Sequence, residues 1–164
     1  MRSGALLASL LCAPAFAAAE IRVVTTTTTL RSITERIAAG RVRVESVAKG
    51  PQDPHFVEAK PSYTVRLREA DLLVAIGLDL EIGWLPNVIR GARNPKVAPG
   101  GPGHLEAGAL VRAIEIPAGK VDRSQGDVHP LGNPHFVLDP VRAAEAARGI
   151  SARLAALDPA GAGE

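Results

Sequence analysis

Two of the four histidines in this 164-residue sequence stand in nearly the same local setting. In both, a short polar residue and a proline precede the imidazole, and a phenylalanine follows it: Asp53-Pro54-His55-Phe56 and Asn133-Pro134-His135-Phe136. A proline fixes its own φ and restricts the residue before it, so little entropy is lost when the next side chain is held still. Imidazole is a common ligand of divalent transition metals. The pattern predicts metal binding by His55 and His135; the alternative is that the prolines only shape two exposed loops.

The other two histidines carry weaker signals. His129 lies close to His135 in the segment Gly126-Asp127-Val128-His129-Pro130. It is a candidate third metal ligand, with two alternatives: a group that supports the ligands from behind, or a temporary docking point on a mobile loop. His104 stands in a glycine-rich stretch and is expected to be exposed, without a role.

Carboxylates near these histidines could orient the imidazoles. An aspartate or glutamate that accepts the second ring N–H of a metal-binding histidine fixes its tautomer. Four acidic residues are candidates to orient an imidazole in this way, namely Asp53, Glu58, Asp127 and Asp139.

Catalysis has less support in the sequence than metal binding. No Gly-x-Ser-x-Gly elbow, His-Glu-x-x-His pair or phosphate-binding glycine loop occurs. A small exported metallohydrolase with an open zinc position is the alternative from a different functional class. Nothing in the sequence supplies its general base, so we do not expect an enzyme.

The composition also argues against a nucleic-acid partner. The chain is 46% hydrophobic and 22% charged, as in ordinary globular proteins, and its formal net charge is only +2. It has three Phe, one Trp and one Tyr, too few for a surface on which bases stack. The arginines are dispersed along the chain rather than gathered into a basic run.

Residues 1–19 have the order of a signal peptide: a positive start, an apolar stretch and small residues that fit a cleavage site. We therefore expect export to the periplasm. Cys12, the only cysteine, lies in this segment after Leu11, where a lipoprotein signal would have a small residue, which disfavours lipid anchoring at Cys12. Cleavage after Ala17 or Ala19 would leave a chain without thiolates, so a metal would be held by His, Asp or Glu.

Strands and helices are expected to alternate along the rest of the chain. β-Branched and apolar runs predict strands at 21–26, 42–47 and 72–76, and helical spacing predicts helices at 30–38, 61–70 and 84–89. A brief strand around Val97, an extended segment within 110–116 and a long loop over 118–134 follow. Asp139 and Pro140 are good starting residues for a last helix, which Asp158-Pro159 ends.

This alternation predicts an α/β fold: a single three-layer lobe with a mainly parallel sheet of about four strands flanked by helices. Ligands of such sheets bind at loops beyond the carboxyl ends of the strands. The loops that carry the histidines are expected there.

Five stretches together give the chain a specific resemblance: 23–26, 50–58 with Pro61-Ser62, 70–77, 81–85 and 119–140. In these stretches the chain resembles the metal-binding solute-binding proteins of ABC importers for zinc and manganese. The resemblance implies that His55 is the first metal-binding histidine of the family and that His135 is the second. It also implies two α/β lobes joined by a long helix, with the metal between them.

The resemblance implies that residues 20–164, which follow the expected signal peptide of residues 1–19, are the N-terminal lobe, with no counterpart of the second lobe. The implied function is periplasmic binding of a divalent transition metal, Zn²⁺ before Mn²⁺, for delivery to the membrane permease of an ABC importer. Because zinc prefers about four ligands, two histidines of one lobe leave an ion half coordinated. We therefore expect weak binding unless His129, a second copy or a second-lobe partner contributes; a further alternative is a truncated lobe that acts as an accessory metal chaperone or scaffold.

Overall fold

The computed structural model describes residues 20–121, 124, 126–159 and 161, and its centre is a four-stranded parallel sheet. The strands are β1 (Ile21–Thr25), β2 (Val42–Ser46), β3 (Leu72–Ala75) and β4 (His104–Glu106). Their order across the sheet is β2-β1-β3-β4, so β1 and β3 lie in the middle. The parallel sheet of the predicted α/β lobe is thus confirmed.

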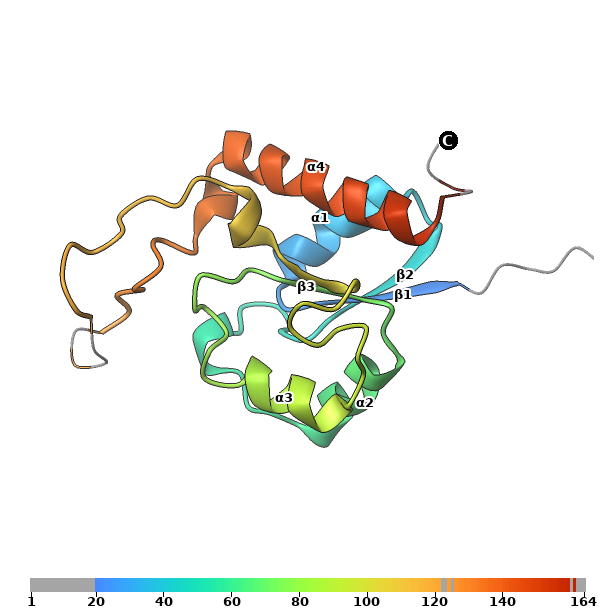
Figure 1. Cartoon of the computed structure of the whole chain (residues 1–164), viewed down its shortest axis with the longest axis horizontal. Coiled ribbons are helices and arrows are strands. Elements are labelled where there is room, and N and C mark those ends of the chain that lie inside the picture. Colours follow the sequence, from blue (N-terminus) through green and yellow to red (C-terminus); the bar gives the residue numbers. More distant parts are fainter. Residues whose placement is uncertain (1–19, 122–123, 125, 160, 162–164) are drawn as a thin grey trace, which may run out of the picture.

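Helices cover both faces of the sheet, as the predicted three layers require (Figure 1). One layer holds α1 (Thr28–Ala38) and α4 (Pro140–Leu157), and the opposite layer holds α2 (Pro61–Glu69) and α3 (Leu85–Ala92). Each layer packs its own apolar cluster against the sheet.

Strand β3 shows how one run of sequence serves both layers. Leu72 and Val74 belong to the cluster under α1 and α4, whereas Leu73 and Ala75 belong to the cluster under α2 and α3. Successive strand side chains point to opposite faces, and all four are buried. A continuous apolar run is the pattern of a parallel strand covered on both sides.

Side-chain caps and prolines set where the helices begin. The Thr27 hydroxyl accepts a hydrogen bond from the Leu30 N–H and caps α1. Asp139 caps α4 by accepting from the Val141 N–H at 2.9 Å, and Pro140 occupies the first helical turn. Pro61 has the same place in α2.

The fourth strand lies later in the chain than the sequence suggested. The brief strand expected around Val97 is wrong: Val97 is fully buried in a turn region, and β4 begins at His104, paired with Leu73 of β3. A Cβ on Gly103 would lie 2.0 Å from the Asp71 carbonyl oxygen, so only glycine lets the chain enter the sheet edge there. A strand of three residues that follows such glycines is too short to show an alternation of apolar and polar residues in the sequence.

The segment after β4 is mostly irregular. It starts with the 3-10 turn η2 (Ala107–Leu110), and residues 111–117 form no strand of the sheet. Asn133 ties this segment to the residues before His135: its N–H donates to the Ile114 carbonyl at 2.9 Å and its Nδ2 donates to Glu115 at 2.7 Å. The described part of 118–134 is a loop, as predicted.

The expected signal peptide, with Cys12, lies outside the described residues. Among the residues that are described, no helix combines the length and the apolar character needed to cross a membrane.

Candidate metal site

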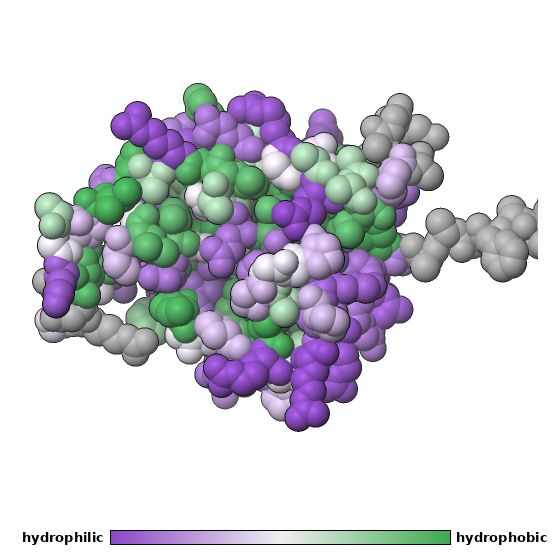
Figure 2. Space-filling view, viewed as in Figure 1, coloured by the Kyte–Doolittle hydropathy of each residue, from purple (hydrophilic) through white to green (hydrophobic). Residues whose placement is uncertain are grey.

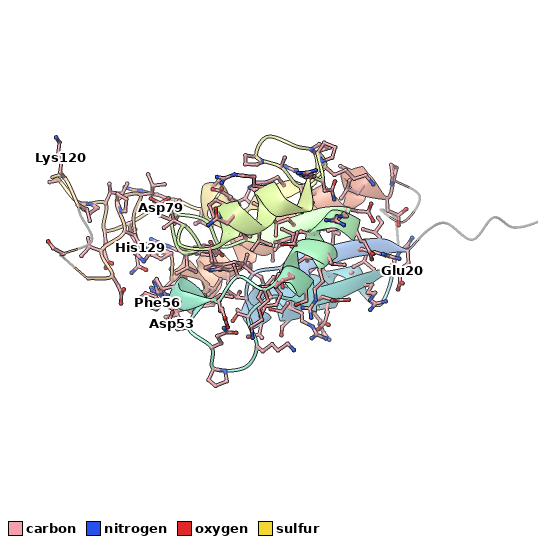
Figure 3. All side chains as sticks on the ribbon, turned by 90° about the horizontal axis from the view of Figure 1, so that it is seen from below. Glu20, Asp53, Phe56, Asp79, Lys120 and His129 are labelled. Atoms are coloured by element: carbon pink, nitrogen blue, oxygen red, sulfur yellow. The ribbon has the colours of Figure 1, made fainter. Side chains whose placement is uncertain are left out.

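Three histidines converge at the end of the lobe where the sheet's strands have their carboxyl ends. His55 lies in the 3-10 turn η1 (Pro54–Phe56), His129 in the long loop, and His135 directly before the 3-10 turn η4 (Phe136–Leu138). Figure 3 shows Asp53, Phe56 and His129 at one end of the molecule and Glu20, which precedes β1, at the other. The loops therefore lie at the end of the sheet that the sequence predicted.

The three imidazoles have the spacing of a metal-binding set. One ligand nitrogen from each of His55, His129 and His135 lies within 4.8 Å of the others. Nε2 of His55 and Nε2 of His129 are 3.1 Å apart. Two nitrogens bound to a tetrahedral zinc at about 2.0–2.1 Å would be about 3.4 Å apart, so small movements suffice to admit an ion.

Asp53 orients the imidazole of His55. Its Oδ1 accepts the backbone N–H of His55 at 2.9 Å and lies 2.6 Å from the ring Nδ1. The backbone hydrogen bond and then the ring hydrogen bond hold the pKa of Asp53 below its usual value, so the carboxylate stays ionised. A carboxylate can only accept, so Nδ1 donates to Asp53, and Nε2 is the ring nitrogen that faces His129.

The other three candidate carboxylates do not orient the imidazole of His55. Asp139 caps α4 and lies 3.3 Å from Arg142, whereas Glu58 is largely exposed beside Lys60. The charge of Asp127 raises the pKa of His129, but it is not the main influence on that ring.

Burial lowers the pKa of His129, and the charges of His55 and His135 lower it further. A lowered pKa keeps the imidazole neutral, which is the form that binds a metal. Nε2 of His55 and Nε2 of His129 face each other at 3.1 Å, a hydrogen-bond distance whose donor depends on the tautomers of the two rings.

The backbone before His135 repeats the arrangement before His55. The Asn133 Oδ1 accepts the His135 backbone N–H at 2.8 Å, as the Asp53 carboxylate does for His55. The Asn133 Nδ2 in turn donates to Glu115 at 2.7 Å, which fixes the amide. The two motifs therefore share this backbone hydrogen bond, although His55 lies inside η1 and His135 lies directly before η4.

Trp84 holds the turn that carries His55, a role not foreseen from the sequence. Its indole Nε1–H donates to the Pro54 carbonyl at 2.8 Å, and the residue is almost completely buried at the start of α3. The signal for it was the presence of a single tryptophan within one of the matched stretches. Its partner could not be foreseen, because the contact joins residues far apart in the chain.

Glu81 is the second residue that sequence reasoning missed. Its buried carboxylate accepts from the Thr26 hydroxyl at 2.5 Å and from the backbone N–H groups of Ile76 and Gly77 at 2.8 and 3.0 Å. Burial raises the pKa of Glu81, although these hydrogen bonds act in the opposite direction. The carboxylate joins the ends of β1 and β3 to the segment that leads into Trp84.

His104 is not an exposed loop residue, contrary to the expectation. It is the first residue of β4, its side chain is only 10% exposed, and its Nδ1 lies 2.8 Å from the Val97 carbonyl oxygen. It does not belong to the three-histidine cluster. The glycines around it mark a tight entry into a strand rather than a solvated loop.

Apolar side chains lie beside the imidazoles. A cavity of about 770 Å³ adjoins His55 and His129, and its lining includes Phe56, Ile82 and Val128, all of them exposed. Figure 2 shows apolar side chains among polar ones on this end of the lobe. An ion bound here would lie beside a partly apolar surface.

Comparison with known proteins places the chain in a family. The family described as "ZnuA: Zinc-uptake complex component A periplasmic" matches residues 23–164. The manganese ABC transporter substrate-binding lipoprotein PsaA of Streptococcus pneumoniae is 33% identical over 76 residues, which are 44% of this chain and 24% of that protein. The PsaA protein of Streptococcus mitis is 26% identical over 145 residues, 85% of this chain and 43% of that protein. The chain spans less than half the length of these curated relatives.

Solved structures agree with the fold. A zinc-bound deletion mutant of ZnuA superimposes with a TM-score of 0.68 at 25% identity, over 87% of this chain and 49% of that one. A metal-free mutant of the periplasmic metal binding protein from Candidatus Liberibacter asiaticus gives a TM-score of 0.66 at 20% identity, over 87% and 48% of the two chains, and supports the fold alone. Because the family match extends over 23–164, this chain belongs to the ZnuA family of periplasmic zinc-uptake components.

Proposed function

We propose that this chain captures a divalent transition metal ion, Zn²⁺ ahead of Mn²⁺, with His55, His129 and His135 as its ligands. The observation that carries the proposal is the convergence of three imidazole nitrogens within 4.8 Å. The captured ion is cargo for the membrane permease of an ABC importer, in line with the family and with the transporter relatives. The family assignment favours this function over an accessory scaffold or a metallohydrolase.

The chemistry of the ligands supports zinc before manganese. All three donors are imidazoles, which suit zinc, whereas manganese prefers carboxylate, carbonyl and water oxygens. The family name and the zinc-bound ZnuA structure point the same way, while the streptococcal relatives are named for manganese. A carboxylate supplied as a further ligand would move the preference toward manganese.

Three protein ligands leave one position of a tetrahedral ion open. Water, a second-lobe donor or a second copy of the chain are the candidates to fill it. An exchangeable ligand at that position suits an ion that must later be handed over.

Calorimetric titration of zinc into the purified chain tests the proposal, with His55→Ala, His129→Ala and His135→Ala measured alongside. We expect one zinc at this site. Loss of a group that only supports a metal ligand costs roughly 10–100-fold in metal affinity. Each substitution removes a ligand itself, so it should weaken zinc binding at least as much. Glu35→Gln, on α1 and paired with Arg31, is the matched control. Unchanged affinity in the variant that lacks all three imidazoles would refute the assignment.

We further propose that residues 1–19 direct export to the periplasm. The family is described as periplasmic, and the streptococcal relatives are named lipoproteins. Mass measurement of the chain recovered from a periplasmic fraction distinguishes the two fates: a start after Ala17 or Ala19 supports simple cleavage, and a lipid-modified Cys12 would contradict it.

A further inference from the structure

A second pair of metal-ligating side chains lies against the edge strand of the sheet, outside the three-histidine cluster. His104 and Glu106 are two residues apart on β4, so their side chains leave the same face. Both line a cavity of about 610 Å³, whose lining also includes Leu85, Ile89 and Arg90 of α3 and Arg93 directly after it. Leu105, between them, is buried in the apolar cluster of the other face.

The imidazole of His104 is set up as a ligand. Its Nδ1 lies 2.8 Å from the Val97 carbonyl oxygen, which can only accept, so Nδ1 carries the proton. Nε2 is then the ring nitrogen that faces Glu106 and is left to bind a metal ion. Metal-binding histidines almost always donate their other N–H in this way, to a carbonyl or a carboxylate. With the side chain only 10% exposed, the ring has little freedom to turn away.

The distance between the two side chains is close to the distance between two adjacent ligands of one metal ion. Nε2 of His104 and Oε1 of Glu106 are 3.6 Å apart, which is too long for a hydrogen bond. Adjacent nitrogen and oxygen ligands of a tetrahedral zinc would be about 3.4 Å apart. Two acceptors that face each other at this distance repel unless a cation lies between them, either a proton on the ring or a metal ion.

Gly77 leaves the room that the Glu106 side chain occupies. A Cβ built on Gly77 would lie 3.0 Å from the Glu106 Cβ and 3.1 Å from its Oε2. The φ of Gly77 is also positive, at 78°. A side chain at position 77 would therefore crowd Glu106 at this point of the cavity.

We propose that His104 and Glu106 form a second, weaker site for a divalent transition metal ion, with water completing the coordination. Asp79 and Ile82 line both this cavity and the cavity beside the three histidines, so the two cavities adjoin. The second site stands on its own geometry and does not depend on the assignment of His55, His129 and His135.

Zinc binding at equilibrium, measured by competition with a chromogenic chelator, tests the second site. The chain in which His55, His129 and His135 are all replaced by alanine should keep one weakly bound zinc. Adding Glu106→Gln to that chain should weaken this zinc at least about tenfold, the lower end of the cost of losing a ligand's outer partner. Glu106 is half exposed, so the isosteric change should leave the fold intact, which thermal melting checks. Adding Glu35→Gln to the triple-alanine chain instead should leave the affinity for this zinc unchanged.

The second site and the proposed function fail in different ways. If the triple-alanine chain binds no zinc, or keeps its zinc after both His104→Gln and Glu106→Gln, then His104 and Glu106 are an ion pair only and the second site is refuted. The proposed function survives that result as long as the native chain binds zinc through its three histidines. If the native chain binds a single zinc that the triple substitution spares and Glu106→Gln weakens, the proposed function falls and the second site stands.

Discussion

At His55, the residue that decides which ring nitrogen can meet a metal is the aspartate two positions earlier. Asp53 accepts both the backbone N–H and the ring Nδ1–H of His55, so one carboxylate fixes the turn and the tautomer together. Asn133 makes only the backbone contact before His135. The two motifs thus share one backbone hydrogen bond, but of the two imidazoles only that of His55 has a carboxylate at its Nδ1.

We expect Asp53→Ala to weaken zinc binding by about 10–100-fold, the usual cost of losing a ligand's outer partner. Asp53→Asn keeps an acceptor oxygen and loses the charge, so its effect should be smaller. Chelator competition measures both. Equal affinity of Asp53→Ala and the native chain would show that Asp53 does not orient His55.

The lowered pKa of His129 predicts a pH dependence of stability in the metal-free chain. Unfolded, this histidine titrates near its usual value of 6.5; folded, burial moves its pKa lower. Between the two values the unfolded chain binds more protons, so the contribution of His129 to the free energy of unfolding falls as the pH drops below 6.5.

Urea unfolding at pH 7.5 and pH 5.5, with zinc removed, measures this contribution. The native chain should lose more stability between the two conditions than His129→Gln, which has no imidazole at that position. An equal loss in both proteins would contradict the prediction.

At the scale of the elements, α3 and the turn η1 act as one unit. The Trp84 indole donates to the Pro54 carbonyl, directly before His55. Upstream, the Glu81 carboxylate ties the same segment to β3 through Ile76 and Gly77. The position of His55 is therefore set by the sheet and by α3, and not by its own loop alone.

Trp84→Phe should separate positioning from packing. It keeps an aromatic ring in the buried cluster and loses the hydrogen bond, whose net value is about 0.5–1.5 kcal/mol, so zinc affinity should fall by about two- to tenfold. Tyr63→Phe, in the same cluster, should leave zinc affinity unchanged. Equal effects of the two substitutions on affinity would show that Trp84 only packs.

For the whole molecule, much of the architecture could be predicted because it has local causes. The apolar run of β3, the cap of α4 at Asp139 and the alternation of strands and helices all have signatures within a few residues. Strand β4 could not be predicted, because three residues behind glycines carry no periodicity and the pairing with β3 creates the strand.

The features of the site also fall into those with local causes, which could be predicted, and those that depend on distant contacts, which could not. The repeated motifs around His55 and His135 identified two ligand candidates from local sequence. The approach of His129, the Trp84 contact and the burial of His104 depend on contacts between distant segments, which a single sequence does not reveal. The ligand candidates, His129 among them, and the end of the sheet where their loops lie could be predicted; the individual contacts between their side chains could not.

The central claim is that three imidazoles from one lobe hold the ion. The most direct test is a crystal structure of the zinc-loaded chain, with the ion located by anomalous diffraction at the zinc edge. We expect one strong peak with nitrogens of His55, His129 and His135 at about 2.0–2.1 Å. A principal zinc bound elsewhere, or held by oxygen ligands with His129 turned away, would contradict this account.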